Sequence, residues 1–414
     1  MTSRSDRWLI LPGIASAAVI AGALLPLSSL RDPVTGEVPA GAQLVLPPGY
    51  VLLSPFSRLF DTIGLLSPGQ HIAVALTTIL VALVVAYWRT ARSARAGLRI
   101  AAAVAISFCV LLIAYACAGA FPRPMAALAV SDTSVARVDF HSHTRFSHDA
   151  RRGFTPEANR AWHRAGGFDV AYISDHNSFT GAQAASRGNP ARAGEGTVLL
   201  SAFEGRYLLT FEIFLSLTEA DSVVLMDWRR WLRDGSLRSG RVPSSVVALP
   251  SPLKDVQASG RDGPPHIAAI EIVDGSPRGF AQQDREGSAI IQRADSLGLA
   301  LVVGSNNHGW GFVAPGWALV SISGWRTLGP DSLAAAIERT IRSSPRTAVR
   351  VVERRRPTST GAGLALTVPV AIVQVIRALS LPERIVWIVW IWVLAILGLR
   401  PRARKTLSSD AVNT

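Results

Sequence analysis

Long apolar segments near both ends of the chain limit its fold more than any other feature. Residues 8–30, 71–88 and 100–121 contain no Asp, Glu, Lys or Arg, and each is close to the ~20 residues that a helix needs to cross a bilayer. A further apolar region occupies residues 360–400. We therefore predict an integral membrane protein with three transmembrane helices in residues 1–125 and one or two in residues 360–400.

Arginine placement predicts the orientation of these helices. The connector at residues 89–99 holds four arginines and the N-terminus holds Arg4 and Arg7, so both regions should lie in the cytoplasm. The first apolar segment has a second interpretation as a cleavable signal peptide, but we favour an uncleaved helix because further apolar segments follow. The third helix then leads outward, so the domain after it should lie outside the cytoplasm, at a bacterial-type inner or plasma membrane.

Two apolar stretches contain charged residues, and the sequence leaves their placement open. Residues 51–66 include Arg58 and Asp61, so we expect an interfacial or re-entrant segment. In the C-terminal region, Pro-Glu-Arg at residues 382–384 separates two short pieces, of which residues 385–399 form the better span. If only that piece crosses, the basic tail after it ends in the cytoplasm. If both pieces cross, the tail ends outside.

Between the apolar regions, residues 132–356 have the character of a globular α/β domain. Short β-rich runs alternate with helical or loop segments, which predicts parallel βα units in a barrel or a doubly wound sheet. A helix should begin at Thr155-Pro156-Glu157, which offers an N-cap and a first-turn proline, and an amphipathic helix should cover residues 330–344. The net charge of +13 comes almost entirely from arginine, and we expect no nucleic-acid partner.

The sequence around His141 and His143 indicates a metal site. These two histidines follow an apolar run two positions apart, so on a strand both imidazoles would point to the same face. His148 and Asp149 follow within a few residues. Imidazole and carboxylate groups gathered in this way are typical ligands of divalent metal ions.

Three later strands are also expected to end in polar residues. Asp175 and His176 end the first of them, Glu204 ends the second, and Asn306 and His308 follow the third. The carboxyl ends of parallel strands meet at one face of such a domain. These side chains should therefore point at a common centre with the two histidines above.

Taken together, these motifs resemble those of the PHP family, the polymerase and histidinol phosphatase superfamily of metal-dependent phosphoesterases. The matching stretches stand in the family's order: His141-Ser-His143-Thr with Ser147-His-Asp149, Ser174-Asp-His-Asn177, Phe203-Glu204, and Gly304-Ser-Asn-Asn-His308. The resemblance covers roughly residues 138–308. It implies an α/β fold, a PHP-like distorted (β/α)7 barrel flanked by the transmembrane helices.

The chain departs from the family's pattern at three positions. Leu249, in Ala-Leu-Pro, stands where the family usually has a histidine ligand, and Phe214 is our match for a second family histidine. Since three-metal members use both histidines for one ion, the paired loss indicates that one metal site is missing. Asn306 stands in place of a family aspartate, and its amide can bind a divalent ion but brings no charge.

The resemblance implies two remaining metal centres. One would use His141, His143, Glu204 and Asn306, and the other His176 and His308 with either His148 or Asp149. Two divalent ions, whether Zn, Mn or Fe, would lower the pKa of a bound water and hold phosphoryl oxygens, so no catalytic side chain beyond this metal-bound water is required.

Three residues near the predicted ligands are candidates for supporting roles. Arg145 and Arg206 could bind a substrate phosphate, and Asp175 could orient an imidazole from behind the ligands. The remaining histidines are expected to serve elsewhere: His163 on the solvated face of its helix and His71 at the membrane interface. His266 is a candidate replacement for a lost ligand.

We therefore predict a membrane-anchored, divalent-metal-dependent phosphoester hydrolase, either a phosphatase or a phosphodiesterase. Its expected partners are the lipid bilayer and a phosphorylated small molecule or nucleotide as substrate. The alternative is a catalytically weakened PHP-fold sensor, scaffold or binding module in the membrane, which Asn306 would favour.

Overall fold

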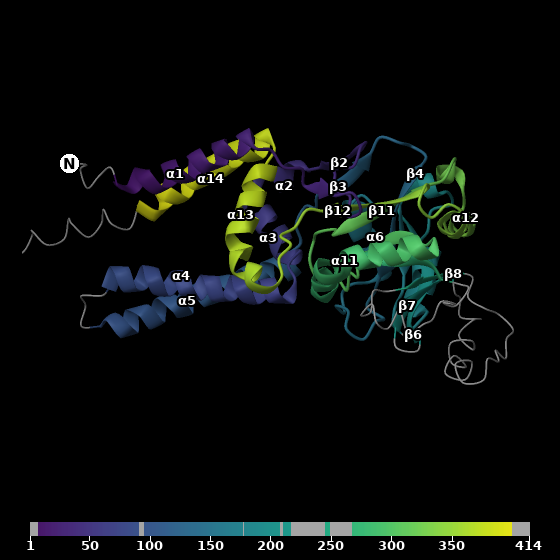
Figure 1. Cartoon of the computed structure of the whole chain (residues 1–414), viewed down its shortest axis with the longest axis horizontal. Helices are drawn as coiled ribbons and strands as arrows, with labels where there is room; N and C mark the ends of the chain where they lie inside the picture. Colours follow the sequence, from purple (N-terminus) through teal and green to yellow (C-terminus); the bar gives the residue numbers. More distant parts are fainter. Residues whose placement is uncertain are drawn as a thin grey trace, which may run out of the picture.

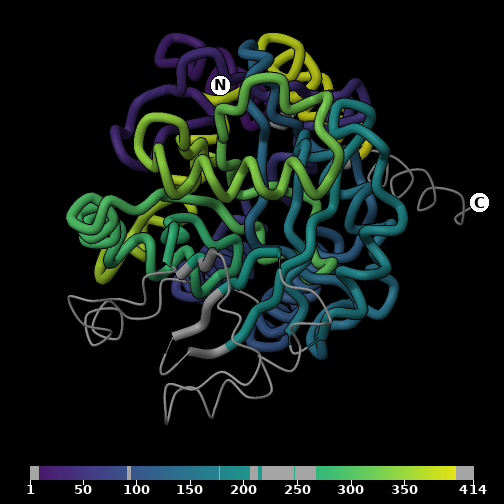
Figure 2. The backbone as a smooth tube through the Cα atoms, turned by 90° about the vertical axis from the view of Figure 1, so that its right-hand side faces the viewer, coloured from purple at the N-terminus to yellow at the C-terminus, as the bar shows by residue number. Residues whose placement is uncertain are grey.

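The structure is a computed structural model, and it describes residues 7–90, 95–176, 178–207, 210–216, 245–248 and 267–399. It combines a helical part built from both ends of the chain with a mixed α/β part built from the middle (Figure 1). Figure 2 looks along the long axis from the α/β end, so that the helical part lies behind the strands.

Four helices of the helical part project from the α/β part in the same direction, as two pairs (Figure 1). The first pair is α1 with α14 and the second is α4 with α5, while α13 runs across both pairs near the α/β part. Their bounds and those of the short elements beside them are α1 (Arg7–Ala21), η1 (Gly22–Leu24), α2 (Pro48–Leu52), α3 (Ser54–Gly64), α4 (Pro68–Thr90), α5 (Ala96–Ala120), η5 (Gly361–Leu366), α13 (Thr367–Ala378) and α14 (Leu381–Leu399).

Three described segments are helices long and apolar enough to cross a membrane: Pro68–Thr90, Ala96–Ala120 and Gly361–Ala378. The first two agree with the helices predicted at residues 71–88 and 100–121. The helix predicted at residues 8–30 is shorter than expected and ends at Leu24, because the following Leu25 precedes a proline and leaves the helical conformation.

The outward surfaces of α4 and α5 are apolar. Leu76, Leu80, Ile106 and Ile113 are each between 60% and 64% exposed. Isolated apolar side chains are common on soluble proteins, but continuous exposure along two neighbouring helices is typical of a surface that contacts lipid or another protein. This surface is compatible with membrane association.

A buried polar cluster, the junction cluster, connects the helical part to the α/β part. At its centre, Asp61 of α3 accepts hydrogen bonds from Tyr50 (2.8 Å) and from Arg354 (3.1 Å), and its other oxygen lies 3.1 Å from Arg123. The side chains of Asp61, Arg123 and Arg354 are each less than 5% exposed. A carboxylate taken out of water needs such partners, so Asp61 fixes the position of α3 against the chain that enters and leaves the α/β part.

A second buried pair of the junction cluster ties α3 to α14. Arg58 donates two hydrogen bonds to the carboxylate of Glu383, at 2.8 and 2.9 Å. The planar guanidinium and the carboxylate match each other in this bidentate arrangement. Arg58 and Asp61 are the charged residues that argued against a membrane span at residues 51–66. Both are therefore neutralised by partners within the protein.

The α/β part is built on one ten-stranded mixed sheet with the order β1-β12-β11-β4-β5-β6-β7-β8-β9-β10. Strands β4 to β6 and β8 to β10 are parallel, whereas β7 is antiparallel to both neighbours. The strands are β1 (Leu30–Arg31), β4 (Val135–Ser142), β5 (Val170–Ile173), β6 (Val198–Tyr207), β7 (Thr210–Leu215), β8 (Ser245–Ala248), β9 (Ile267–Asp274), β10 (Ala300–Gly304), β11 (Gly316–Ser321) and β12 (Val349–Arg354), with β2 (Ala42–Val45) and β3 (Ala127–Val130) forming a separate pair.

The barrel expected from the sequence is not confirmed. Over the described residues no ladder closes β10 onto β4, although an isolated bridge between Ser142 and Asn307 joins the end of β4 to the chain after β10. The antiparallel β6-β7 hairpin also departs from the uniform parallel βα units that the sequence predicted. The observed fold class is mixed α/β with one large sheet.

The helices of the α/β part follow the sequence signals closely. Helix α6 (Pro156–Ala165) begins where predicted, and Thr155 accepts a hydrogen bond from the backbone of Ala158 (3.2 Å). Helix α12 (Pro330–Ser343) buries Leu333, Ile337 and Ile341 in the main core, as its periodicity predicted. The other elements are α7 (Thr180–Arg187), η2 (Ala193–Glu195), α11 (Pro277–Leu297) and η4 (Trp325–Thr327).

Removing the carboxylate of Asp61 should destabilise the protein strongly. In Asp61→Ala, the buried Arg123 and Arg354 lose a shared counter-charge, a change that typically costs about 3–5 kcal/mol. We expect the thermal unfolding midpoint of the detergent-solubilised protein to fall by roughly 5 °C or more. The control is Glu37→Ala at an exposed position, which should stay near the wild type. An equal effect of both substitutions would contradict the role of the junction cluster.

Candidate metal centre

The carboxyl ends of four strands converge on one site. Strand β4 supplies His141 and leads into His143, β5 leads into His176, β6 carries Glu204, and the chain after β10 supplies His308. This convergence is what the sequence predicted for a set of parallel strands. The site lies in the parallel half of the sheet that holds β4, β5 and β6 and next to the end of β10.

A register shift in β4 determines where His141 points. Strands β4 and β5 pair in register up to Asp139, but one extra residue of β4 is accommodated before Ser142. Such a bulge turns the following side chain to the other face of the sheet. Consequently the Asp139 side chain meets a helix, whereas His141 reaches Glu204.

Glu204 is the centre of the site. Its Oε2 atom lies 3.2 Å from each of three ring nitrogens, those of His141 Nε2, His143 Nε2 and His176 Nδ1. All four side chains are at least four-fifths buried. One carboxylate oxygen therefore holds three imidazoles from two different strand ends in a space from which water is largely excluded.

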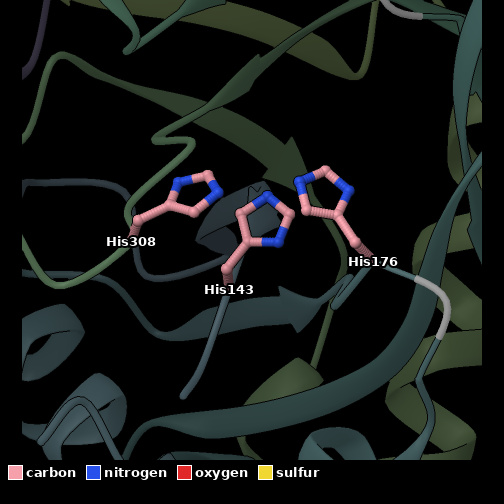
Figure 3. A group of neighbouring side chains, drawn as sticks. All are labelled: His143, His176 and His308. Atoms are coloured by element: carbon pink, nitrogen blue, oxygen red, sulfur yellow. The ribbon is translucent and has the colours of Figure 1, made fainter. Parts of the chain in front are cut away.

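Two groups of side chains have the spacing of metal ligands. His141, His143 and Glu204 form one, and His143, His176 and His308 form the other, with the ligand atoms of each group within 4.8 Å of one another. Figure 3 shows the second group, with the ring of His143 between those of His308 and His176. The rings of His143 and His308 are stacked with centroids 4.0 Å apart.

His143 belongs to both groups, but only one of its ring nitrogens is available as a metal ligand. Its Nδ1 is hydrogen-bonded to Ser147 (3.0 Å), so only Nε2 faces the ligands. If two ions are bound, His143 would therefore share an ion with His141. Glu204 would then lie between that ion and His176. The structure thus brings His141, His143, His176 and His308 together around Glu204.

The structure distinguishes between His148 and Asp149, which the sequence left open. Asp149 places its carboxylate oxygens 3.2 Å from His308 Nε2 and 3.7 Å from His176 Nε2. Both residues are exposed, but the nearest contact of His148 with these ligands is a ring-centroid distance of 5.3 Å to His176. Asp149 is therefore better placed to complete the second centre.

Asn306 has a buried side-chain oxygen without a hydrogen-bond partner among the described residues. Its Nδ2 donates a hydrogen bond to Asp274 (3.0 Å), while its buried Oδ1 has no hydrogen-bond partner within the described part of the chain. The residue has a positive φ of 46°, a conformation that Asn adopts more readily than most residues. An unsatisfied carbonyl oxygen beside His308 would be costly without a positive partner.

Glu271 is a site residue that the sequence reasoning did not select. It is fully buried in β9, and its Oε2 lies 3.4 Å from His141 Nδ1, on the far side of that ring from Glu204. A carboxylate behind a ligating imidazole fixes the ring and its tautomer. The sequence feature that could have identified Glu271 is its place as a single acidic residue inside the apolar run of residues 267–273.

Gly304 permits this contact. A Cβ atom at Gly304 would overlap both Glu271 Oε1 and His141 Cβ, so only glycine fits between β9 and β4 at this point. The glycine of the Gly-Ser-Asn-Asn-His motif is therefore required by the close packing of Glu271 against His141.

Asp175 supports the site through an intermediate hydroxyl rather than by touching a ring. Its carboxylate accepts hydrogen bonds from Thr144 N (2.6 Å) and Ser147 Oγ (3.2 Å), and Ser147 in turn meets His143. The expectation that Asp175 orients an imidazole directly is therefore modified. It fixes the loop after β4 and the hydroxyl that orients His143.

The prediction that His163 lies on a solvated helix face was wrong. His163 is fully buried, and its Nε2 lies 2.7 Å from the Asp139 carboxylate. Asp139 also accepts hydrogen bonds from the backbone N–H groups of His141 (3.1 Å) and Ser305 (2.8 Å). The helix α6 histidine thus anchors the two ligand-bearing segments to each other.

The charges at the site shift pKa values in opposite directions. Burial alone would raise the pKa of Glu204, but His141 and His143 outweigh it and hold the value well below its usual range. Burial raises the pKa of Glu271 to about 8, against the opposing effect of His141. Burial would lower the pKa of His141, but Glu271 and Glu204 raise it well above its ordinary value. A proton on His141 and a metal cation would compete for the same carboxylates.

Several predicted residues lie outside the site or outside the described part of the chain. Arg145 is exposed, with its guanidinium over the ring of Phe146, and it does not line the cavity at the ligands. Nothing is described for the side chain of Arg206 or for Leu249, Asn177 and His266. Arg278 is the arginine that lines this cavity, together with ligand residues.

The match of Phe214 to a lost metal ligand was wrong. In the antiparallel pair of β6 and β7, Phe214 stands opposite Phe203, and Ile213 stands opposite Glu204. Directly opposed residues share a face of the sheet, so Phe214 points away from the face that carries Glu204. The apolar residue on the ligand face is Ile213.

The donor set fits divalent metal ions. Nitrogen and oxygen atoms 2.9–3.2 Å apart, as between His141, His143 and Glu204, are compatible with neighbouring ligands around an ion about 2.0–2.2 Å from each. Mixed imidazole and carboxylate ligands suit Zn, Mn or Fe and do not choose among them. The orphaned Asn306 oxygen adds a further donor of the right kind.

Comparison with known proteins gives limited similarity. No protein-family model and no curated protein matches the chain. Among solved structures, PsfC from Pseudomonas syringae is 16% identical over 58% of this chain and 98% of its own, with a TM-score of 0.34. A two-domain Bacteroides vulgatus protein containing a predicted PHP-like metal-dependent phosphoesterase is 14% identical over 53% of this chain and 65% of its own, with a TM-score of 0.32.

A third solved structure, a candidate metal-dependent phosphoesterase from Bifidobacterium adolescentis, is 17% identical over 48% of this chain and 94% of its own, with a TM-score of 0.28. The structural neighbours thus include PHP-like metal-dependent phosphoesterases. At these scores the likeness carries no argument about the activity of this chain, which rests on its own residues.

The two neighbouring residues His148 and Asp149 provide a test of the ligand set. Asp149→Asn should weaken binding of the second metal equivalent by about tenfold or more, because an anionic oxygen beside His176 and His308 is lost. His148→Ala should change it by less than about threefold. Competition of each variant with a chromogenic zinc chelator measures these affinities. A larger effect of His148→Ala would contradict the assignment.

Proposed function

We propose that this protein is a divalent-metal-dependent phosphoester hydrolase anchored in the membrane. The observation that carries the proposal is the contact of one Glu204 oxygen with three imidazoles from two strand ends, with a second cluster of imidazoles adjoining it. An anionic residue between two ligand groups can offset the repulsion between two cations.

Bound divalent ions would act as Lewis acids toward the phosphoryl oxygens and lower the pKa of an attacking water. The chain's own residues hold this site in place. Glu271 and Ser147 fix the rings of His141 and His143, respectively, from behind. Arg278 brings a positive charge to the cavity beside the ligands, where it can meet a substrate phosphate.

A second function remains, that of a binding module or sensor with the same fold. It is favoured by one feature, the amide of Asn306 in place of a carboxylate, which reduces the negative charge available to two cations. The two functions differ in whether the bound ions support turnover.

Hydrolysis of an aryl phosphate by the purified full chain tests the proposal. With Mn or Zn supplied, the wild type should hold about two metal equivalents and hydrolyse p-nitrophenyl phosphate, and a chelator should abolish both. His141→Ala should lower kcat/KM by about a hundredfold or more, since a ligand and the partner of Glu271 are lost together. Arg145→Ala serves as the control and should retain activity.

Asn306→Asp separates the hydrolase from the binding module. In an active wild type, the added charge should change metal affinity by about tenfold or more and leave hydrolysis in place. If the wild type is inactive with metal bound and Asn306→Asp creates activity, the binding module is the correct function. Metal analysis showing no bound ion in the wild type would refute both.

We also propose that α1, α4, α5 and α14 cross the membrane, with the α/β part outside the cytoplasm. Although residues 361–378 are long and apolar enough for a span of their own, we place α13 in the interface because it runs across both helix pairs (Figure 1). The support is that the start of α1, the end of α4, the start of α5 and the end of α14 lie together, away from the α/β part (Figure 1). The arginine-rich connector and the basic tail adjoin those ends, as the positive-inside rule requires.

Reporter fusions test this topology. Alkaline phosphatase joined after residue 356 should be active, because it would fold outside the cytoplasm, and green fluorescent protein at that point should be dark. Green fluorescent protein joined after residue 414 should be bright, because α14 returns the chain to the cytoplasm. The opposite pattern at residue 356 would place the α/β part in the cytoplasm.

A further inference from the structure

The cavity at the metal centre has two unlike walls. One wall consists of ligand residues, among them Asp149, His176, Glu204 and His308, and the cavity has a volume of about 540 Å³. The opposite wall consists of helix ends from the helical part: Ile63 and Gly64 of α3, His71 of α4, and Tyr115, Ala118 and Gly119 of α5. The candidate active site therefore opens onto the helices that are apolar enough to cross a membrane.

A direct connection holds these two walls together. The ligand His308 is followed by Gly309, Trp310 and Gly311, and the Gly311 N–H donates a hydrogen bond to Gly119 O at the end of α5 (2.8 Å). Gly311 O in turn accepts a hydrogen bond from Trp162 (3.1 Å). The distance between the metal ligands and the helix ends is thus set by three residues of chain.

The cavity lies at the depth of lipid head groups if α5 crosses the membrane. Helix α5 has 25 residues, against the ~20 that span the apolar core of a bilayer. Tyr115 and Gly119 belong to its last two turns, on the side of the α/β part. Trp310 beside them is 58% exposed and lies over the guanidinium of Arg151, an aromatic and cationic pair of the kind found at membrane surfaces.

The helix wall changes from polar to apolar along its length. His71 Nδ1 and Tyr115 Oη are 2.8 Å apart at the cavity. Beyond them, on the side away from the ligands, α4 exposes Ile72 and Leu76 and α5 exposes Ile113 and Leu112, each by more than half. A molecule with a charged head and an apolar tail could place its head at the ligands while its tail stays on this lipid-facing surface.

We propose that the substrate is a membrane amphiphile whose phosphorylated head group enters this cavity from the bilayer surface. This inference rests on the proposed phosphoesterase function for its chemistry, but the amphiphile site can be tested separately as a binding site. Water-soluble phosphoesters would meet the same ligands without the apolar surface of α4 and α5. They would therefore be bound more weakly.

Two glycines of α5 give a matched pair of variants. Outside the neighbouring backbone of α5, a Cβ atom at Gly119 or at Gly97 would meet no heavy atom within 4 Å, so both variants should fold with a larger residue there. Gly119 lines the cavity, whereas Gly97 lies at the opposite end of α5. Gly119→Phe should fill the helix wall of the cavity, and Gly97→Phe should not affect it.

The binding experiment uses the detergent-solubilised full chain and native mass spectrometry. Dioleoyl phosphatidate is the probe, and dioleoylglycerol, which lacks the phosphate, is its comparison. We expect the wild type and Gly97→Phe to retain the phosphatidate about tenfold more than dioleoylglycerol, and Gly119→Phe to lose about fivefold or more of that retention. Equal retention by Gly119→Phe and Gly97→Phe would overturn the inference.

The turnover experiment separates this inference from the proposed function. With Mn, the wild type in nanodiscs should hydrolyse dioleoyl phosphatidate with a kcat/KM about tenfold or more above that for sn-glycerol 3-phosphate, because burying a few methylene groups supplies that factor. Hydrolysis of p-nitrophenyl phosphate without any preference for the lipid would refute the amphiphile and leave the phosphoesterase. Gly119-dependent lipid binding without hydrolysis of any phosphoester would refute the phosphoesterase and support the amphiphile site.

Discussion

A single buried carboxylate holds the candidate site of this protein together. The Glu204 oxygen of β6 that meets His141, His143 and His176 is the shared partner of side chains from the ends of β4 and β5, and no apolar residue could take its place among three imidazoles. Burying such a group is favourable only when its partners are fixed in advance. The surrounding structure is accordingly arranged to fix them.

Polar residues behind the metal-ligand candidates hold the imidazole partners of Glu204 in place. Asp139 binds His163 and two backbone N–H groups, and Asp175 binds the loop after β4. Glu271 reaches His141 across Gly304. Each of these carboxylates is buried and hydrogen-bonded, so the ligands are held by a connected network rather than by packing alone.

The site also depends on the helical part for its position. The junction cluster around Asp61 fixes α3 to the ends of the α/β part, and Gly311 binds the last turn of α5. The cavity beside the ligands is bounded by these same helices. Separating the α/β part from the helices would therefore remove one wall of the cavity, which is the physical reason to study the full chain.

The apolar helices, the start of α6, the buried face of α12 and the candidate metal ligands could all be predicted from the sequence. These features depend on local chemistry: hydropathy over about 20 residues, a capping residue, a helical period, and the choice of His, Asp and Glu. The tertiary structure alone decided that a bulge turns His141 toward Glu204, that Asp149 rather than His148 reaches the second group, and that His163 and Glu271 are buried supports. It also decided that Phe214 faces away from the site and that the cavity opens onto α4 and α5. These outcomes depend on strand register and on contacts between residues far apart in the chain, which no local pattern encodes.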